Sequence, residues 1–334
     1  MSRRMGRYRA TSTRQRGVSF LVFATLASLY VLFLRPVDGL DRYRTVARAP
    51  EARLALNARG RSGAVAMRFA LPGEQVDLPL EVHGDPAALR YSWLPVGKVS
   101  TTDAPSLAST LLAPKQPGFY RLAVLSDSGM RVFDDVPLAV LVPFSAKTGT
   151  ELNGYRIGKY RVERRPFESV AAPRGFIQVM PGDLDLQVTE HLRLADFISH
   201  DAQSTWPRYV ALDPRLLDKL ELVFRALTLL TDSVRDGNLS TIDVRSGFRT
   251  PLHNRQVARS ASDSRHQYGD AADVTVDADR NGRVNAADAR LVASAVERVE
   301  REHPDLVGGL GLYTRSGTAY VHIDARGTRA RWRG

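Results

Sequence analysis

Apolar residues recur at intervals of three to four between positions 214 and 234, as they do on one face of an amphipathic helix. Asp213 is a favourable N-cap for this helix, and Pro214 is suited to its first position. The same patterns predict further helices at 251–259 and 286–302, and strands at 176–179, 241–245, 271–276, 310–313 and 319–325. This mixture predicts an α+β domain with a small antiparallel sheet over residues 176–334.

The pattern upstream is different. From residue 62 to 145, short apolar or alternating runs are divided by proline, glycine and aspartate. The expected strands lie at 65–71, 75–82, 88–94, 118–126 and 130–142. They predict an all-β sandwich of immunoglobulin-like type with Trp93 in its core. We expect this domain to act as a spacer, or to contact a protein partner or a polymer. Residues 146–175 connect the two domains and contain a further expected strand at 152–162.

Residues 17–34 carry no charged side chain and follow an arginine-rich tail, residues 1–16. A helix of this length is about 27 Å long, close to the shortest that crosses a bilayer. We expect an uncleaved, single-pass signal anchor in the inner membrane, with the basic tail in the cytoplasm. Residues 35–61 form a stalk, and the remaining domains face the periplasm or the cell exterior. A cleaved signal peptide is the alternative.

The net charge of +11 over 334 residues does not indicate a nucleic-acid-binding protein. Six arginines lie in the first 16 residues and four in the last ten, so the body of the chain is close to neutral. Nucleic-acid binding requires a basic face on the folded part. The chain has no cysteine, which excludes thiol catalysis, disulfides and cysteine-based metal sites.

Candidate metal ligands are concentrated near the C-terminus. His266 and Asp273 are seven residues apart, and His322 lies in a strand-like apolar run. Catalytic zinc is usually held by three nitrogen or oxygen ligands, with a fourth position left for water or substrate. These three residues are therefore candidates for a zinc site.

Four motifs surround them: Ser-Gly-Phe-Arg-Thr-Pro at 246–251, Ser-x-His-x-x-Gly-x-Ala-x-Asp at 264–273, Gly-Gly-Leu-Gly-Leu-Tyr at 308–313 and Tyr-Val-His-Ile-Asp at 320–324. In this order they resemble the superfamily of zinc D-Ala-D-Ala carboxypeptidases and murein endopeptidases, whose fold is shared with hedgehog signalling domains. The resemblance covers about residues 176–332.

The resemblance implies that His266, Asp273 and His322 bind zinc and that Arg249 helps to polarise the scissile carbonyl. Ser264 and Tyr320 are further expected to contact the substrate. The substrate implied is peptidoglycan, and zinc is the implied cofactor. Of the two activities in the superfamily, we expect cleavage of murein crosslinks ahead of removal of a terminal D-Ala, because an anchored enzyme on a stalk suits a polymer network.

One position departs from the superfamily. Many members carry an acidic general base three residues before the last zinc histidine, where this chain has Ala319. Side chains of a strand alternate between its faces, so Asp324 is expected on the same face as His322. Asp324 is our candidate for the general base; the alternative is that it orients an imidazole.

A second cation motif follows the zinc aspartate. Residues 277–288 match the spacing of an EF-hand loop and resemble dockerin loops, with candidate calcium ligands Asp277, Asp279, Asn281, Arg283, Asn285 and Asp288. We expect a structural calcium ion here. The alternative is a turn rich in Asp and Asn that caps the next helix, with Asn285 as the N-cap.

Two other function classes remain open at this point. The missing acid at Ala319 is compatible with a non-catalytic peptidoglycan-binding scaffold. The loop at 277–288 is compatible with a calcium-dependent interaction protein.

Overall fold

The computed structural model describes residues 54–56, 65, 67–77, 80–82, 85–97, 104–127, 129–167, 170–230, 242–314 and 319–334. The expected cytoplasmic tail and membrane segment, together with most of the stalk, lie outside these residues. Within them, no helix has both the length and the apolar character that crossing a membrane requires.

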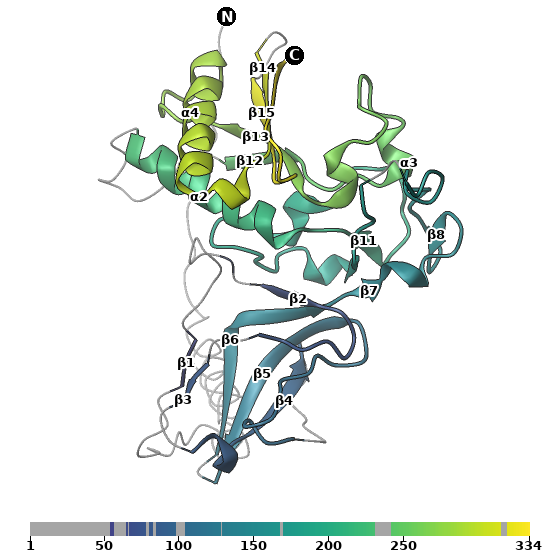
Figure 1. Ribbon diagram of the computed structural model, residues 1–334, viewed down its shortest axis with the longest axis vertical. Coiled ribbons are helices and arrows are strands. Elements are labelled where there is room, and N and C mark those ends of the chain that lie inside the picture. The colour runs from purple at the N-terminus through teal and green to yellow at the C-terminus, as the bar shows by residue number, and fades with distance from the viewer. Residues whose placement is uncertain are drawn as a thin grey trace, which may run out of the picture. The chain divides into compact units, whose positions relative to one another are not determined.

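The N-terminal part contains a four-stranded sheet (Figure 1). Its strand order is β2-β6-β5-β4, and its members are β2 (Arg68–Ala70), β4 (Arg90–Pro95), β5 (Gly118–Ser126) and β6 (Gly129–Val140). β5 and β6 form a long antiparallel hairpin, whereas β2 runs parallel to β6. A separate two-stranded ladder joins β1 (Leu54–Leu56) to β3 (Leu80–Val82).

This arrangement differs from the predicted immunoglobulin-like sandwich. The described residues show one four-stranded sheet with a small core on one face, which includes Tyr91, Leu122 and Val124; Trp93 is half-buried beside it. At the end of the sheet that contains Phe119 and Ala139, the face opposite this small core is not covered by a second sheet in the described residues. There Phe119 and Ala139 belong to the large core that continues into the C-terminal domain. The strand pattern was therefore predicted correctly in outline, but what covers the sheet was not.

A three-stranded antiparallel sheet in the order β11-β10-β7 is formed by strands on both sides of the connecting region: β7 (Val142–Pro143), β10 (Gly175–Val179) and β11 (Arg208–Val210). The single strand predicted over 152–162 is wrong. Residues there form a tight hairpin of β8 (Glu151–Leu152) and β9 (Tyr155–Arg156), because Asn153 and Gly154 adopt the positive φ angles of a turn.

The C-terminal domain is built on a five-stranded sheet in the order β12-β13-β15-β14-β16. Its strands are β12 (Ile242–Ser246), β13 (Ala271–Val276), β14 (Gly309–Tyr313), β15 (Tyr320–Asp324) and β16 (Ala330–Arg333). All pairs are antiparallel except β14 and β16, so the sheet is mixed rather than purely antiparallel. The edge strand β16 was not predicted.

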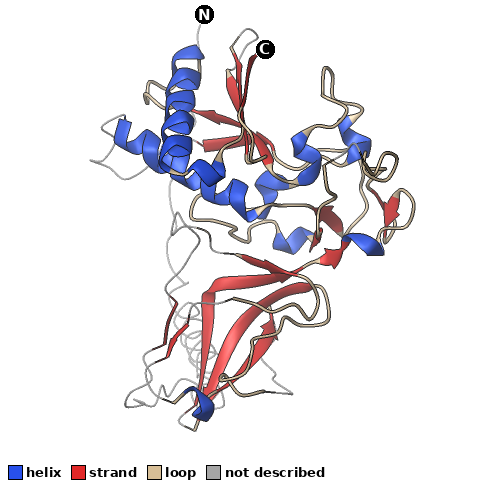
Figure 2. Cartoon of the chain, in the orientation of Figure 1, coloured by secondary structure: helices blue, strands red, loops and turns tan. Residues whose placement is uncertain are grey.

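Two long helices accompany this sheet (Figure 2). They are α2 (Pro214–Leu230) and α4 (Ala286–Glu302), which contact each other, and α4 also packs on β13, β14 and β15. The bounds of α4 are those predicted, and Asn285 caps it by accepting a hydrogen bond from the Ala287 amide. The helix predicted at 251–259 is shorter in the structure: α3 (Pro251–Asn254) ends at Asn254, and Arg255 is its C-cap.

Short 3-10 helices complete the fold. They are η2 (Pro86–Ala88), η3 (Phe144–Ala146), η4 (Pro181–Asp183), η5 (Leu194–Phe197), η7 (Arg265–Tyr268) and η8 (Pro304–Leu306). η7 ends at Gly269, whose φ of 75° is in the left-handed region. A Cβ at this glycine would overlap the carbonyl of Ala211, so only glycine fits there. This tight turn places the histidine of η7 next to the start of β13.

Candidate metal centre

One row of residues crosses the five-stranded sheet on a single face. The register places Ser246 beside Asp273, Asp273 beside His322, His322 beside Gly311, and Gly311 beside Trp332. Cross-strand neighbours project to the same side of a sheet. The order of the strands (Figure 1) thus brings together residues separated by up to 86 positions in the sequence, and the bend after β12 adds Arg249.

The three predicted zinc ligands meet beside this row. Nε2 of His266 lies 3.2 Å from Oδ1 of Asp273 and 3.1 Å from Nδ1 of His322, and that Nδ1 lies 2.9 Å from the same Oδ1. Ligand atoms bound to tetrahedral zinc at about 2.0–2.1 Å lie about 3.3 Å apart. All three side chains are buried. The donor set and its spacing therefore fit a zinc ion.

The outward nitrogens of the two imidazoles are also fixed. Nδ1 of His266 lies 2.7 Å from the Gly247 carbonyl oxygen, and Nε2 of His322 lies 3.1 Å from Oδ2 of Asp324. Both partners are acceptors, so the outward nitrogen of each ring carries the proton. This assigns the tautomers and leaves the inward nitrogens as lone-pair donors, as a metal site requires.

Arg249 contacts the centre directly. Its guanidinium donates to Oδ2 of Asp273 at 2.6 Å, and its Nε donates to the Ser246 hydroxyl at 2.7 Å. Oδ2 is not the oxygen that faces the imidazoles, so the ion pair leaves Oδ1 available as a ligand. The Arg249 side chain is 12% exposed and can still meet a substrate.

Electrostatics favour the metal-binding forms of His266 and Asp273, whereas they favour the protonated form of His322. Burial lowers the pKa of His266, which favours its neutral form. Burial alone would raise the pKa of Asp273, but the nearby His266 and His322 outweigh it and hold that pKa well below its usual value. For His322, burial acts downward, yet hydrogen bonds with Asp273 and Asp324 raise its pKa. The carboxylate therefore stays ionised at neutral pH.

Asp324 lies behind His322, away from the ligand atoms. It is completely buried and accepts hydrogen bonds from the Gly309 amide at 2.7 Å and from the Arg326 guanidinium at 2.5–2.9 Å, besides its contact with His322. The alternation argument placed it correctly on the face of His322. Its geometry nevertheless argues against the general-base role, because both oxygens are already engaged on the far side of the ring.

The other two residues predicted to contact the substrate, Tyr320 and Ser264, have different surroundings. Tyr320 stacks on Tyr313 with ring centroids 4.4 Å apart and lies under the Arg245 guanidinium. Burial, followed by the charge of Asp273, raises the pKa of Tyr320, so its phenol stays protonated. Ser264 occupies the N-cap position of η7 without a capping hydrogen bond from its hydroxyl. Ala319 is buried.

Trp332 is a contributor that the sequence analysis did not identify as part of the site. Its indole lies 5.1 Å from the His322 ring, and its Nε1 donates to the Tyr313 hydroxyl at 2.8 Å. The indole lies across β14 at Gly311, where a Cβ would overlap it. The combination of Gly311 with an aromatic residue in the tail is the sequence signal for this contact. Trp332 thus shields one side of His322 from water.

The acidic loop before α4 is ordered by its own hydrogen bonds. Asp277 accepts from the amides of Asn281 and Gly282, and Asp288 accepts from those of Ala278 and Asn285. Oxygens of Asp277, Asp279 and Asp288 lie within 4.8 Å of one another. The capping role predicted for Asn285 is present.

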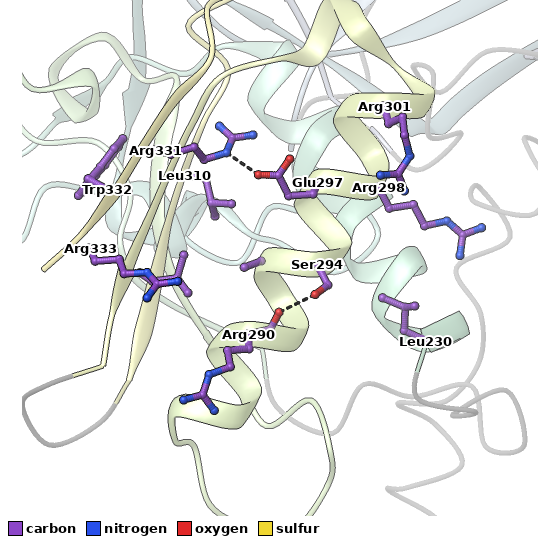
Figure 3. Close-up of a pocket in the computed structure, with 12 residues that line it drawn as sticks. Leu230, Arg290, Ser294, Glu297, Arg298, Arg301, Leu310, Arg331, Trp332 and Arg333 are labelled. Carbon is purple, nitrogen blue, oxygen red and sulfur yellow. Dashed lines mark hydrogen bonds and ion pairs between the residues drawn. The ribbon is translucent and has the colours of Figure 1, made fainter.

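A hollow of about 860 Å³ lies apart from the metal centre. It lies between α4 and the sheet (Figure 3), where Arg331 and Leu310 point toward the helix that carries Glu297, while Trp332 lies on the other side of its strand. A smaller hollow of about 350 Å³ is lined by Pro251 and Gln267, close in sequence to Arg249 and His266. The candidate metal ligands Asp273 and His322 therefore lie on the face of the five-stranded sheet opposite α4.

Comparison with family models matches residues 203–332 to the family described as peptidoglycan L,D-endopeptidase MepK. The match includes α2, the five-stranded sheet except Arg333 at the end of β16, and all the residues placed at the metal centre. The corresponding searches of curated proteins and of solved structures gave no match.

Proposed function

Since residues 203–332 belong to the zinc murein peptidase superfamily, we propose that this protein is a zinc-dependent peptidoglycan endopeptidase. The resemblance predicted from the four motifs is confirmed for the C-terminal domain. The observation that carries the proposal is the convergence of His266, Asp273 and His322 with their inward lone pairs within 2.9–3.2 Å of one another.

The chain's own residues prepare hydrolysis of a peptide bond. A zinc ion held by the three ligands would supply a Lewis acid that polarises the scissile carbonyl and activates water for attack. Arg249 presents a fixed positive charge beside Asp273, where it stabilises the developing oxyanion. Asp324 holds the proton on Nε2 of His322 and thereby the ring orientation, and Trp332 keeps water from that ring.

We favour cleavage of crosslinks between stem peptides over removal of a terminal D-Ala. The matched family is described as an L,D-endopeptidase, which supports a bond between an L-configured and a D-configured centre. An anchored chain with a stalk and an additional β-domain also suits access to a polymer network.

Digestion of purified sacculi tests this proposal. Zinc-loaded protein is expected to convert crosslinked muropeptide dimers to monomers, as measured by liquid chromatography and mass spectrometry. Protein treated with a chelator should lose this activity and regain it with zinc. Release of free D-Ala with intact dimers would assign a carboxypeptidase instead. Binding to sacculi without any turnover at saturating zinc would favour the scaffold.

We also propose that residues 17–34 anchor the protein in the inner membrane, with the β-domain and peptidase domain in the periplasm or outside the cell. The uncharged segment and the preceding arginines support this topology. In a membrane fraction washed with high salt and carbonate, the full-length chain should remain and its C-terminal domain should be accessible to protease from the outer side. Recovery of a soluble chain that begins after residue 34 would show a cleaved signal peptide.

We further propose that the loop 277–288 binds a structural calcium ion. Its EF-hand spacing and the proximity of three carboxylates support the proposal. Calcium should raise the melting temperature of the wild type, and Asp277→Asn should abolish that rise. If the wild type melts at the same temperature with and without calcium, the calcium site is rejected and the loop acts only as a cap of α4. Loss of sacculus binding on calcium removal, with hydrolysis unaffected, would favour the interaction protein.

A further inference from the structure

One tyrosine beside the metal centre has a hydroxyl that the fold does not use. Among the residues that the structure describes, the Tyr320 hydroxyl has no hydrogen-bond partner, and it reaches solvent. Other tyrosines of the chain differ: Tyr155 donates to Asp201 at 2.6 Å, and the Tyr313 hydroxyl accepts from Trp332 at 2.8 Å. The position of the free phenol of Tyr320 therefore decides what it can do.

The sheet places Tyr320 on the face that carries the metal ligands. It lies two residues before His322 in β15, so both side chains project to the same side. Two residues of a strand span about 7 Å. Asp273 in β13 pairs with His322 and is therefore the diagonal cross-strand neighbour of Tyr320, a position that an aromatic side chain can reach. The Tyr320 ring thus stands next to two of the three ligands.

The charges at the metal centre act on this phenol. Burial raises the pKa of Tyr320, Asp273 raises it further, and Arg249 lowers it. An exposed charge more than about 10 Å away would be largely screened. Tyr320 therefore lies within electrostatic range of the carboxylate and of the guanidinium at the centre, which agrees with the position given by the strand register.

Two contacts hold the ring of Tyr320. The Tyr313 ring stacks on it with centroids 4.4 Å apart and planes 4° apart, and the Arg245 guanidinium lies 5.1 Å from its centroid. Tyr313 is fixed in turn by the hydrogen bond from Trp332, whose indole lies 5.1 Å from the His322 ring. These contacts form an unbroken series from the phenol back to a metal ligand. A donor held in this way needs no reorganisation when charge develops in a transition state.

We infer that Tyr320 is a catalytic hydrogen-bond donor, whose phenol binds the oxygen of the scissile carbonyl as negative charge develops on it. The inference rests on the proposed function, because attack on a carbonyl creates this charge. When water adds to the carbonyl carbon, the π electron pair of the C=O bond moves onto the oxygen. It returns when the C–N bond breaks and the nitrogen takes a proton from the water. The phenol keeps its own proton throughout, and so adds a neutral donor to the charged one that Arg249 provides.

Tyr320→Phe tests the hydroxyl, because it keeps the ring that stacks on Tyr313. With the zinc-loaded chain and crosslinked muropeptide dimers, kcat should fall about 100-fold, the usual cost of losing one preorganised donor. KM should change less than about three-fold, because the hydrogen bond is made chiefly in the transition state. A raised KM with unchanged kcat would overturn the inference, and so would a matching loss of bound zinc.

Tyr313→Phe is the matched control, since it removes a hydroxyl from the other ring of the same stack. This hydroxyl binds Trp332 and is not free for a substrate. Its loss should lower kcat less than about five-fold, the effect of one neutral hydrogen bond. Equal losses of kcat in the two variants would overturn the donor and show that the stack only supports the fold.

Binding without turnover separates this inference from the proposed function. The probe is a stem-peptide analogue in which a phosphinate replaces the scissile amide, because its tetrahedral, negatively charged group resembles the transition state. In calorimetry with zinc-loaded protein, Tyr320→Phe should bind it about 100-fold more weakly than the wild type. Tyr313→Phe should stay within about five-fold of the wild type.

The outcomes of this measurement are distinct. Weaker binding by Tyr320→Phe alone, in a chain that hydrolyses no peptidoglycan bond, would keep the donor and reject the peptidase. Equal affinities of the three proteins, or no binding by any of them, would overturn the donor even if the wild type cuts crosslinks.

Discussion

The metal centre and the acidic loop 277–288 each bring three ligand atoms within 4.8 Å of one another, yet they are held differently. At the metal centre, the outward atoms of His266, Asp273 and His322 are fixed by Gly247, Arg249 and Asp324, so the inward atoms face one another. In the loop, the carboxylates themselves close the turns by accepting backbone amides. Proximity alone does not define a metal site; the partners of the remaining atoms do.

Removing one ligand from each region should give the largest difference between them in zinc binding and hydrolysis. His266→Ala should abolish zinc binding and reduce crosslink hydrolysis at least about 1,000-fold, because two ligands hold the ion poorly and its Lewis acidity is lost. Asp277→Asn should leave zinc content and rate within about two-fold. Metal analysis by mass spectrometry and muropeptide digestion measure both. Full activity in the His266 variant at saturating zinc would reject the centre.

The support of His322 can be tested next. Asp324→Asn keeps the shape but removes the charge that orients the imidazole, so zinc affinity should fall about 10–100-fold. At saturating zinc, kcat should stay within about 10-fold of the wild type. A general base would behave differently, since its removal costs about 100–10,000-fold in rate at any zinc concentration.

Glu300→Gln is the matched control for this variant. Glu300 is also a buried carboxylate bonded to cations, Lys219 at 2.7 Å and Arg331, but within the described part of the chain it accepts no hydrogen bond from an imidazole. Both substitutions should destabilise the fold by about 3–5 kcal/mol, as expected when one partner of a buried pair is removed. Only Asp324→Asn should weaken zinc binding, as measured by competition with a chelator.

A smaller effect is expected at the indole that covers His322. Gly311→Ala places a methyl group where the ring of Trp332 lies, so the ring must shift, at a cost of about 1–3 kcal/mol. Hydrolysis should fall several-fold because water reaches the imidazole. Gly182→Ala is the control, since a Cβ there meets nothing within 4 Å. Equal stability of the two variants in urea would argue against the contact.

Some features of the fold and of the metal centre could be predicted from the sequence, and others could not. The bounds of α4 were predictable because an Asn cap precedes a clear amphipathic repeat. The strand β16 was missed because two of the four residues in its Ala-Arg-Trp-Arg sequence are charged, and it is held by pairing with β14 rather than by an apolar pattern. The motifs predicted which residues meet at the metal centre. Strand alternation predicted that Asp324 lies on the same face as His322. It could not predict that Asp324 contacts Nε2, the nitrogen facing away from the other ligands, because this contact depends on the orientation of the imidazole ring.

A third cluster of possible metal ligands, which contains His191 and Glu221, is where the smallest effect is expected. Nδ1 of His191 lies 2.7 Å from Oε2 of Glu221, and Glu190 is nearby. The hydrogen bond to Glu221 raises the pKa of His191 against an opposing effect of burial. A raised folded-state pKa stabilises the protein below the unfolded value of about 6.5, and this contribution is lost as the pH rises through the folded value. Because the His191 side chain is 34% exposed, we expect only about 0.5 kcal/mol. Urea unfolding at pH 5.5 and 8.5 should show that His191→Gln loses stability relative to the wild type mainly at the lower pH. A difference of the same size at both values would mean that the imidazole contributes by packing, and that this cluster, unlike the metal centre, does not depend on its charge.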